Sequence, residues 1–433
     1  MNKYLNSNQT NCPAWFNEGL EHIWLPYTQM KTAPPPAPVS HTDGVRIFLE
    51  DGRILIDGIA SWWTACHGYN NRHIRSCIES QLKKMPHVMF GGLVHQPALK
   101  LAKRLTSKMP SSLNRVFFSE SGSVSVEVAL KMSIQYWVNS GYPKKNKIIG
   151  FLGGYHGDTF GAMSVCDPEE GMHKLFRGSI PDQYIMKLPQ TNKDIEEIEF
   201  FLSNNASKCA AMIVEPLIQG AGGMVMYDDE VLIRLRNLCS KYDILLILDE
   251  IFTGFCRTGN FYAFESAEIT PDIVTLSKAL TGGTIPLAAT VASKNIYDAF
   301  LSENAEFALM HGPTYMANPL SCAAANASLD LFEIEPRLEQ VHKISLQMSE
   351  ELDCCLTIPG VVDVRVKGAV GVVELEGEIR IDWLREKFLQ ELVWIRPFRN
   401  IVYLTPAFTI SEQDLSTLTS SIYRVVSSWS QKM

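Results

Sequence analysis

Two short apolar runs, each followed at once by a reactive side chain, most constrain how this chain can fold. The first, 244–248, reads ILLIL and ends in Asp249 and Glu250. The second, 273–276, reads IVTL and delivers Lys278 just past its end. An apolar run of strand length is what a parallel sheet covered on both faces requires. Because ligands bind beyond the carboxyl ends of such strands, we expect an acid and an amine to face one ligand.

Strand and helix patterns alternate through the middle of the chain. Expected strands lie at 115–118, 147–151, 210–214, 244–248, 273–276 and 287–292, and expected helices at 97–109, from 124 onward and at 229–242. Repetition of strand, helix and strand predicts a right-handed, mainly parallel α/β sheet. After about residue 331 the pattern changes to a smaller α+β unit, with four strands expected between 361 and 408 and helices over 381–391 and 411–430.

The beginning of the chain has a different character. Residues 1–38 contain aromatic residues and a proline-rich stretch, which predict an extended arm. A β-hairpin is expected next, with strands at 46–49 and 53–56. Trp62 and Trp63 follow in a predicted loop, where two tryptophans are more often anchors of the core than ligand contacts.

Composition excludes several classes of function. The chain has 433 residues, of which 46% are hydrophobic and 20% charged, so it can bury a large core. A net charge of -8 argues against nucleic acid as a main partner. No apolar run approaches the roughly 20 residues of a membrane span, and no signal peptide is expected. The ten cysteines lack a CxxC pair, so we expect reduced thiols in a cytoplasmic protein and no metal site.

Two further segments suit a ligand. Gly122 and Ser123 precede the helix expected from residue 124, where free backbone N–H groups and the helix dipole favour an anion. Serine at such a place is also a routine N-cap, so the signal alone is weak. Tyr155 and His156 stand between glycines after the strand at 147–151, and glycines that flank an aromatic residue let a flat ligand approach closely. A plain turn is an equally good interpretation.

These groups describe one ligand if they meet above the strand ends. Gly122 and Ser123 suit a phosphate, and Tyr155 suits the face of an aromatic ring. Asp249 suits a protonated ring nitrogen, and the amine of Lys278 can form a Schiff base with an aldehyde. Together these needs describe pyridoxal 5′-phosphate. We expect burial and crowding by cationic groups to lower the pKa of Lys278, so that the amine can act as a nucleophile and then as a base.

The stretch around Asp249 and Lys278 resembles the signature of class III aminotransferases. It reads LILDEIFTGFCRTGNFYAFE, followed by PDIVTLSKALTGG. The resemblance extends from about residue 21 to 410 through the segments HIWLPYTQM, SWWTACHGYN, MFGGLVHQPA, GYHGDTFGAMSVCDP, EPLIQGAGGMVMY, HGPTYMANPLSCAAANASL and WIRPF. These segments match the branch of the family that aminates 8-amino-7-oxononanoate in biotin biosynthesis.

The resemblance implies the architecture. It is fold type I of the pyridoxal-phosphate enzymes, an α/β fold with a large domain around a mainly parallel sheet and a smaller α+β domain built from both chain ends. The expected divisions are 1–75 for the arm and part of the small domain, 76–330 for the large domain and 331–433 for the rest of the small domain. A cytoplasmic homodimer with shared active sites is also implied.

The resemblance also implies roles for single residues. The expected catalytic residues are Lys278 and Tyr27. The expected cofactor ligands are Gly122, Ser123, Tyr155, Asp249 and Lys278, joined by Pro313 and Thr314 of the other subunit. The expected substrate contacts are Tyr27, Trp62, Tyr155, Arg257, Lys278, Gly312 and Arg396. Among these, Arg257 is expected near the pocket entrance, and Arg396, in a predicted strand, is expected to hold the far carboxylate of the keto acid.

The implied reaction is ping-pong transamination with S-adenosylmethionine as the amino donor, although some relatives use lysine. General ω-aminotransferases acting on ornithine, 4-aminobutyrate or a diamine share the signature but do not account for WLPYT and SWW. The residues also leave open a dialkylglycine decarboxylase, a semialdehyde aminomutase and a cofactor-binding protein without turnover. The sequence departs from the family at Cys256 and Ser277, which replace common glycines, and at PAF where PPY is usual. Cys256 puts the geometry of its turn in question.

Overall fold

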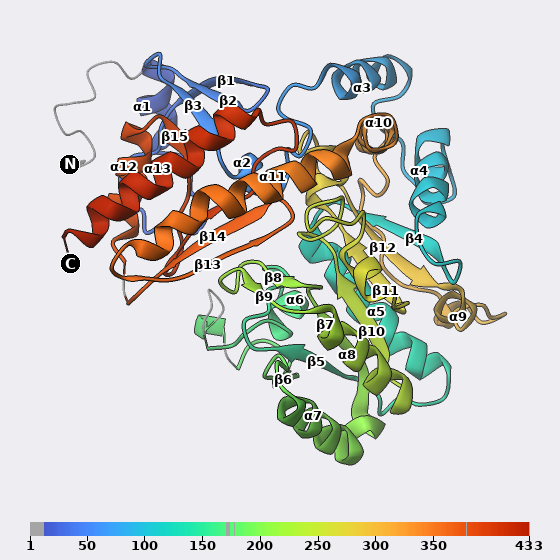
Figure 1. Ribbon diagram of the computed structural model, residues 1–433. Coiled ribbons are helices and arrows are strands. Elements are labelled where there is room, and N and C mark those ends of the chain that lie inside the picture. Colours follow the sequence, from blue (N-terminus) through green and yellow to red (C-terminus); the bar gives the residue numbers. More distant parts are fainter. Residues whose placement is uncertain (1–12, 170–173, 177, 378, 433) are drawn as a thin grey trace.

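The computed structural model describes residues 13–169, 174–176, 178–377 and 379–432, which form two packed units (Figure 1). The larger unit contains the middle of the chain. The smaller unit brings the blue N-terminal strands beside the orange and red C-terminal segment. This is the α/β architecture of fold type I that the sequence predicts, while the domain boundaries in residue numbers stay predictions.

A seven-stranded sheet forms the centre of the larger unit, in the order β4-β12-β11-β10-β7-β5-β6. Its strands are β4 (Leu113–Ser119), β5 (Lys147–Phe151), β6 (Tyr184–Met186), β7 (Cys209–Val214), β10 (Leu245–Asp249), β11 (Ile273–Leu276) and β12 (Ala288–Ser293). All pairings are parallel except those of β12, which is antiparallel to β11 and β4. The predicted mainly parallel sheet is therefore confirmed.

Helices bury both faces of this sheet. Leu245 and Ile247 of β10 pack into a cluster with apolar residues of α5, whereas Leu246 and Leu248 pack into the main core on the other face. The unbroken apolar run of β10 follows from this double burial. The helices of this unit are α3 (Arg72–Lys84), α4 (Gln96–Ser107), α5 (Gly122–Asn139), α6 (Phe160–Ser164), α7 (Asn192–Asn205), α8 (Asp229–Lys241), α9 (Lys294–Asp298) and α10 (Pro319–Ile334).

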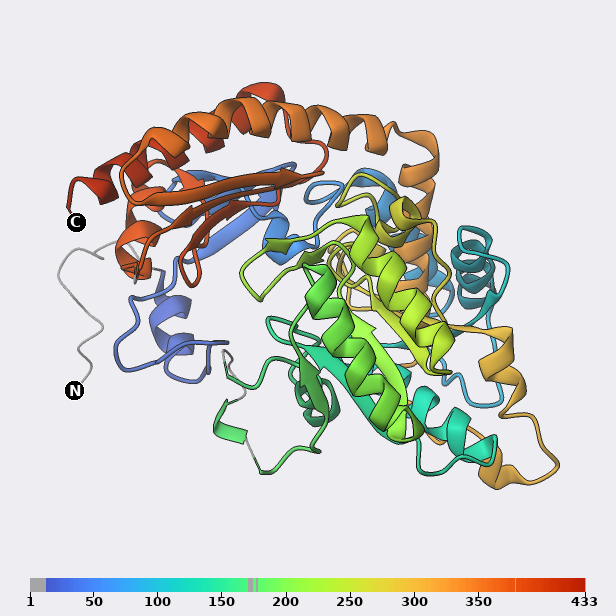
Figure 2. The ribbon, with the colours of Figure 1, turned by 60° about the horizontal axis from the view of Figure 1, so that its bottom comes forward.

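Two small sheets form the smaller unit. One has the order β1-β2-β3-β15 and the other β13-β14-β16. The strands are β1 (Val39–Asp43), β2 (Arg46–Leu49), β3 (Ile54–Asp57), β13 (Val361–Lys367), β14 (Val370–Leu375), β15 (Val393–Trp394) and β16 (Ile401–Leu404). Helices α11 (Arg337–Leu352), α12 (Ile381–Gln390) and α13 (Glu412–Ser430) complete it, and α11 and α13 lie along one side of the strands (Figure 2).

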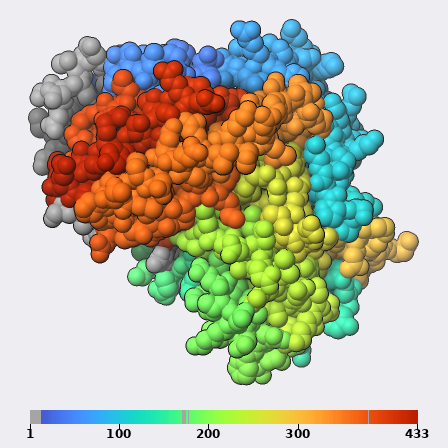
Figure 3. Space-filling model, viewed as in Figure 1, coloured from blue at the N-terminus to red at the C-terminus, as the bar shows by residue number. Residues whose placement is uncertain are grey.

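The two chain ends meet in this smaller unit. Strand β15 pairs in parallel with β3, so Val393 lies opposite Ile56. A two-stranded ribbon of β8 (Ile218–Gln219) and β9 (Val225–Met226) belongs to the larger unit. In the space-filling view the red and orange C-terminal segment lies between the blue N-terminal segment and the green and yellow larger unit (Figure 3). Among the helices that the structure describes, none is long and apolar enough to cross a membrane.

Three local expectations need correction. The predicted arm contains a short helix, α1 (Ala14–Leu20). The two tryptophans lie in a short helical turn, α2 (Ala60–Trp63), with positive φ angles, because the Asp57 carboxylate accepts hydrogen bonds from the backbone N–H groups of Ile59 and Ser61. Arg396 is not in a strand, because β15 ends at Trp394. The predicted hairpin of β2 and β3 is confirmed.

Candidate active site

A cavity of about 170 Å³ lies where β5, β7, β10 and β11 end. Five of its lining residues are predicted from the sequence as site residues: Gly122, Ser123, Tyr155, Asp249 and Lys278. The other lining residues are Trp63, His156, Gly157, Glu215, Ile251, Phe252 and Ser277. The acid and the amine that follow the two apolar strands therefore share one cavity. Among the residues that the structure describes, no group of His, Cys, Asp and Glu could hold a metal ion.

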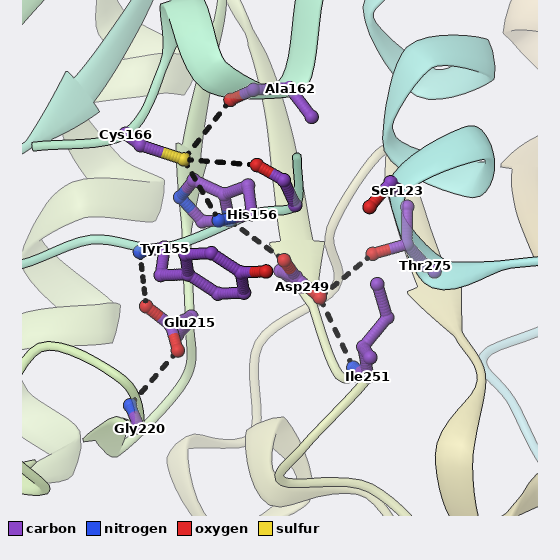
Figure 4. A network of polar contacts seen from close by, with 12 residues as sticks. Ser123, Tyr155, His156, Ala162, Cys166, Glu215, Gly220, Asp249, Ile251 and Thr275 are labelled. Carbon is purple, nitrogen blue, oxygen red and sulfur yellow. Dashed lines mark hydrogen bonds and ion pairs between the residues drawn. The ribbon is translucent and has the colours of Figure 1, made fainter. Parts of the chain in front are cut away.

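Asp249 is held at the end of β10 by three hydrogen-bond donors (Figure 4). Its carboxylate accepts hydrogen bonds from Nδ1 of His156 at 2.7 Å, from Oγ1 of Thr275 at 3.1 Å and from the backbone N–H of Ile251 at 3.1 Å. Burial alone would lower the pKa of His156, but the hydrogen bond and charge of Asp249 outweigh it and raise that pKa. Asp249 is 3% exposed, so its carboxylate is held in a buried position by these three hydrogen bonds.

Lys278 begins a short 3₁₀ turn (Lys278–Thr281) immediately after β11. Its Nζ lies 4.5 Å from the ring centre of Trp63 and 5.9 Å from that of Phe252. Burial lowers the pKa of Lys278 to about 8, while the negative charges of Asp249 and Glu215 act in the opposite direction. The expected lowering is present, but the expected cationic crowding is wrong, since the neighbouring charges are carboxylates.

The N-terminus of α5 forms a second wall of the cavity. Ser121 caps the helix by accepting a hydrogen bond from the N–H of Val124, which leaves the amides of Gly122 and Ser123 at the open end. Gly157 packs directly against Ser123: a Cβ at Gly157 would lie 2.7 Å from the Ser123 Cα, and its φ of +130° also favours glycine. Gly157 was not expected as a site residue, although its place two residues after Tyr155 marks it in the sequence.

Glu215 and Tyr155 are tied together on the opposite wall. The Glu215 carboxylate accepts hydrogen bonds from the backbone N–H of Tyr155 at 3.0 Å and from that of Gly220 at 2.9 Å. Burial raises the pKa of Glu215 to about 7. Glu215 and His156 were not expected as site residues, although Glu215 directly follows β7 and His156 lies in the loop after β5. A polar residue after a strand end is the signal that identified Asp249.

Tyr155 connects the cavity to a line of aromatic contacts, formed by Tyr155, Tyr27 and Trp62 and ending at Arg396. The Oη atoms of Tyr27 and Tyr155 lie 3.2 Å apart, and Tyr27 also donates a hydrogen bond to Asp158. The rings of Tyr27 and Trp62 meet edge to face at 5.8 Å, and the Arg396 guanidinium lies 4.4 Å from the centre of the Trp62 ring. Burial, with the hydrogen bond to Asp158, raises the pKa of Tyr27 to about 12.

The remaining predicted residues neither line the cavity nor belong to the aromatic line, whose members Tyr27, Trp62 and Arg396 also lie outside the cavity lining. Arg257 is 1% exposed and donates hydrogen bonds to the carbonyl oxygens of Ala369 at 3.2 Å and Pro406 at 2.8 Å, and its expected position near the pocket entrance stays a prediction. Two loops of the smaller unit cover it. Gly312, Pro313 and Thr314 lie in a largely exposed loop before α10.

The two departures from the family pattern that replace glycines are accommodated locally. Cys256 adopts a φ of +70°, and its backbone N–H donates to the carbonyl oxygen of Phe261 at 3.1 Å, so the turn forms with a side chain in a conformation that glycine adopts freely. Ser277 donates a hydrogen bond from its Oγ to the carbonyl oxygen of Leu287 at 2.9 Å.

The chain resembles known proteins over nearly its whole length. The family described as aminotransferase class-III matches residues 27–426. The adenosylmethionine-8-amino-7-oxononanoate aminotransferase of Buchnera aphidicola subsp. Acyrthosiphon pisum is 42% identical over 409 residues, which cover 93% of this chain and 95% of the relative. The enzyme of the same name from Corynebacterium glutamicum is 41% identical over 419 residues, which cover 94% and 97%.

Solved structures agree with this similarity. The adenosylmethionine-8-amino-7-oxononanoate aminotransferase of Methanocaldococcus jannaschii matches with a TM-score of 0.91 and 32% identity, covering 95% of this chain and 98% of that chain. An amine transaminase from an uncultivated Pseudomonas species, solved in its PLP-bound form, matches with a TM-score of 0.88 and 30% identity, covering 94% and 99%. The chain that arranges Asp249 and Lys278 around this cavity therefore belongs to the class III aminotransferases.

Proposed function

We propose that this chain transfers an amino group from S-adenosylmethionine to 8-amino-7-oxononanoate, which yields 7,8-diaminononanoate in biotin biosynthesis. The observation that carries the proposal is the meeting of Asp249 and Lys278 in one cavity that adjoins the aromatic line ending at Arg396. The names of the relatives from B. aphidicola and C. glutamicum support the choice of substrates.

The groups around the cavity fit pyridoxal 5′-phosphate. Gly122 and Ser123 would hold the phosphate with their free amides, and Asp249, oriented by its three hydrogen-bond donors, would hold the ring nitrogen. Tyr155 would flank the ring, and Lys278 would bind the aldehyde. The close packing of Gly157 on Ser123 supports this fit, because any side chain there would fill the space beside the helix start. The bound cofactor stores the amino group between the two half-reactions and accepts electron density when a proton is removed.

Lys278 is the group that moves the proton. With a pKa of about 8, its amine is partly neutral near neutral pH and can take a proton from the α carbon of the donor and return one to the acceptor. Trp63 and Phe252 pack beside the amine and limit its contact with water. Asp249 transfers no proton to substrate in this proposal, since its oxygen atoms are used by His156, Thr275 and Ile251.

The aromatic line is proposed to choose the substrate. Arg396 would bind the carboxylate of the keto acid, while Trp62 and Tyr27 would line the path of its aliphatic chain. The hydrogen bonds of Tyr27 with Asp158 and Tyr155 support a further role for its hydroxyl group in orienting the amine that reacts. The proposed substrate contacts of Arg257 and Gly312 remain predictions, because neither residue lines the cavity.

A homodimer is part of the proposal. Pro313 and Thr314 would complete the phosphate site of a second copy, and their position in a loop that does not reach the cavity of their own chain supports this role. A cytoplasmic location is proposed as well. It is supported by the cysteines in the described part of the chain, which are all free.

The experiment that tests the proposal replaces the predicted amine. Lys278→Ala should abolish the visible absorbance of the bound cofactor and reduce turnover of 8-amino-7-oxononanoate to background. Lys84→Ala, at an exposed position, is the matched control and should retain both. Transamination by Lys278→Ala at the wild-type rate would refute the assignment.

The donor is tested by half-reactions. Wild-type enzyme loaded with pyridoxal 5′-phosphate is mixed with S-adenosylmethionine or with lysine, and the change to the absorbance of the aminated cofactor is followed. Conversion by S-adenosylmethionine alone is expected. Conversion by neither compound, or release of CO₂, would redirect the assignment to an ω-aminotransferase or a decarboxylase.

A further inference from the structure

A second polar cluster lies behind the cavity, on the far side of the turn that carries Lys278. It consists of His67, Ser328 at the middle of α10 and Arg337 at the start of α11. These side chains are 3%, 0% and 4% exposed, so each polar atom must find a partner within the protein. None of the three lines the cavity, and the proposed chemistry uses none of them.

In each hydrogen bond of this cluster the donor is fixed, so the bonds lead from Arg337 through His67 and Ser328 to Ala279. Nε of Arg337 lies 3.1 Å from Nδ1 of His67 and, as a guanidinium N–H, can only donate. His67 therefore accepts at Nδ1. Burial first, and then the charge of Arg337, lower the pKa of His67 to about 3, so the ring is neutral and carries its one proton on Nε2.

The remaining contacts follow from this protonation state. Nε2 of His67 donates to Oγ of Ser328 at 3.1 Å, and this leaves the Ser328 hydroxyl proton free. That hydroxyl donates to the carbonyl oxygen of Ala279 at 3.4 Å. Ala279 is the residue directly after Lys278, and its carbonyl also accepts the backbone N–H of Gly282, which closes the turn, at 2.9 Å.

The turn needs such support because its backbone is strained. Lys278 has a φ of +43°, in the left-handed region that residues with a side chain adopt only when their surroundings hold them there. His67 also packs against the end of the turn: a Cβ at Gly282 would lie 3.2 Å from its Cδ2 atom. The cluster therefore contacts both the middle and the end of the turn.

We propose that Arg337, His67 and Ser328 form a directional hydrogen-bond relay that holds the turn of Lys278, and that His67 is a positioning residue for the reactive amine. The inference rests on the proposed function for its catalytic consequence. The position of the Lys278 amine, by contrast, can be tested whether or not the proposed function is right.

The test uses two variants that remove hydrogen bonds of the relay and one variant that keeps part of them. Ser328→Ala removes the hydroxyl donor to the Ala279 carbonyl, which keeps the Gly282 N–H and the Cys66 thiol as donors, and His67→Leu removes both of the hydrogen bonds of the ring. His67→Gln provides an amide N–H in place of Nε2–H and serves as the conservative variant. Ser133→Ala is the matched control, because Ser133 is also buried in a helix but donates only to Ala129 of its own helix.

Two measurements are made on each full-length variant. The first is the pH dependence with which Lys278 reacts with pyridoxal 5′-phosphate, fixed by borohydride and quantified in the labelled peptide by mass spectrometry. The second is kcat and KM for 8-amino-7-oxononanoate. A thermal unfolding curve is recorded alongside.

With a loosened turn, water reaches the amine, so the labelling midpoint of Ser328→Ala and His67→Leu should rise from about pH 8 toward the ordinary value of lysine. Their kcat should fall about tenfold or more with KM changed by less than about twofold, while His67→Gln recovers part of both losses. Ser133→Ala should change the unfolding temperature alone.

Wild-type midpoint and kcat in Ser328→Ala and in every His67 variant that folds would overturn the relay, whatever their unfolding temperatures. A wild-type enzyme that is labelled at Lys278 but transfers no amino group would instead refute the proposed function. The labelling midpoints would still decide the relay in that case.

Discussion

Asp249 and His156 are joined by a 2.7 Å hydrogen bond although both side chains are almost fully buried and 93 positions separate them in the chain. Both residues line the cavity, and the hydrogen bond and charge of Asp249 raise the pKa of His156 against the effect of burial. The position of the Asp249 carboxylate thus depends on a histidine that the sequence pattern did not mark as a site residue.

Replacing His156 should therefore weaken the site. We expect His156→Gln to lower kcat at least tenfold, because a hydrogen bond to a charged group is worth about 1.5–3 kcal/mol. His73→Gln is the matched control: His73 pairs with Asp330 at 2.9 Å but both side chains are partly exposed, so the loss should stay below about 1 kcal/mol of stability with unchanged kcat. Equal kinetic effects of the two variants would contradict this role of His156.

The same pair predicts a pH dependence of stability. The pKa of His156 in the folded protein is raised above its ordinary value of 6.5. A raised pKa means that the pair stabilises the fold fully below about pH 6.5 and loses this contribution as the pH rises through the folded-state pKa. The difference in unfolding free energy between the wild type and His156→Gln, measured with denaturant from pH 6 to 10, should shrink as the pH increases. A constant difference would indicate that the histidine is neutral throughout.

The glycine beside the phosphate site should be irreplaceable. Gly157→Ala should raise the Kd for pyridoxal 5′-phosphate at least tenfold, because the added methyl group would lie 2.7 Å from the Ser123 Cα. Gly141→Ala is the control, since Gly141 also has a positive φ, of +89°, but nothing lies within 4 Å of its Cβ position. The control should lose about 1–2 kcal/mol of stability from backbone strain and bind the cofactor normally. Calorimetric titration of both variants measures the comparison.

Arg396 should act on one substrate only. We expect Arg396→Ala to raise KM for 8-amino-7-oxononanoate about 10- to 100-fold, in line with the roughly 1.5–3 kcal/mol of a charge-assisted hydrogen bond. The half-reaction with S-adenosylmethionine should change less than about threefold. An analogue with a methyl group in place of the carboxylate should not distinguish the variant from the wild type. Arg424→Ala, which breaks a surface ion pair with Glu391, is the control and should change neither. If Arg396→Ala also lost the half-reaction with S-adenosylmethionine, Arg396 would act on both substrates, which would contradict this prediction.

The sequence identifies the centre of the site because the ends of buried strands have predictable directions. Asp249 and Lys278 end neighbouring parallel strands, β10 and β11, so their meeting follows from local pattern and topology. The pairing of His156 with Asp249 could not be predicted in this way. It depends on the strand order, in which β7 separates β5 from β10, and the periodicity of single segments carries no information about that order.

The surroundings of Arg257 and Arg396 could not be predicted from local sequence pattern. Arg257 belongs to the recognised signature, yet its position depends on the carbonyl oxygens of Ala369 and Pro406, which lie more than a hundred positions away. The expected strand around Arg396 does not form, because β15 has a partner for Val393 and Trp394 only. At both positions, contacts between distant segments decide the local structure.

The pairing of β3 with β15 sets an order in which the site can be assembled during synthesis. The N-terminal hairpin leaves the ribosome first, but β3 can pair with β15 only after Val393 has been synthesised. At about 5–20 residues per second, synthesis of the intervening chain takes on the order of tens of seconds. The segments that bear Gly122, Asp249 and Lys278 have all emerged by then. A nascent chain can thus assemble the strand ends that line its cavity while the segment of Arg396, the proposed carboxylate-binding residue, is still being translated.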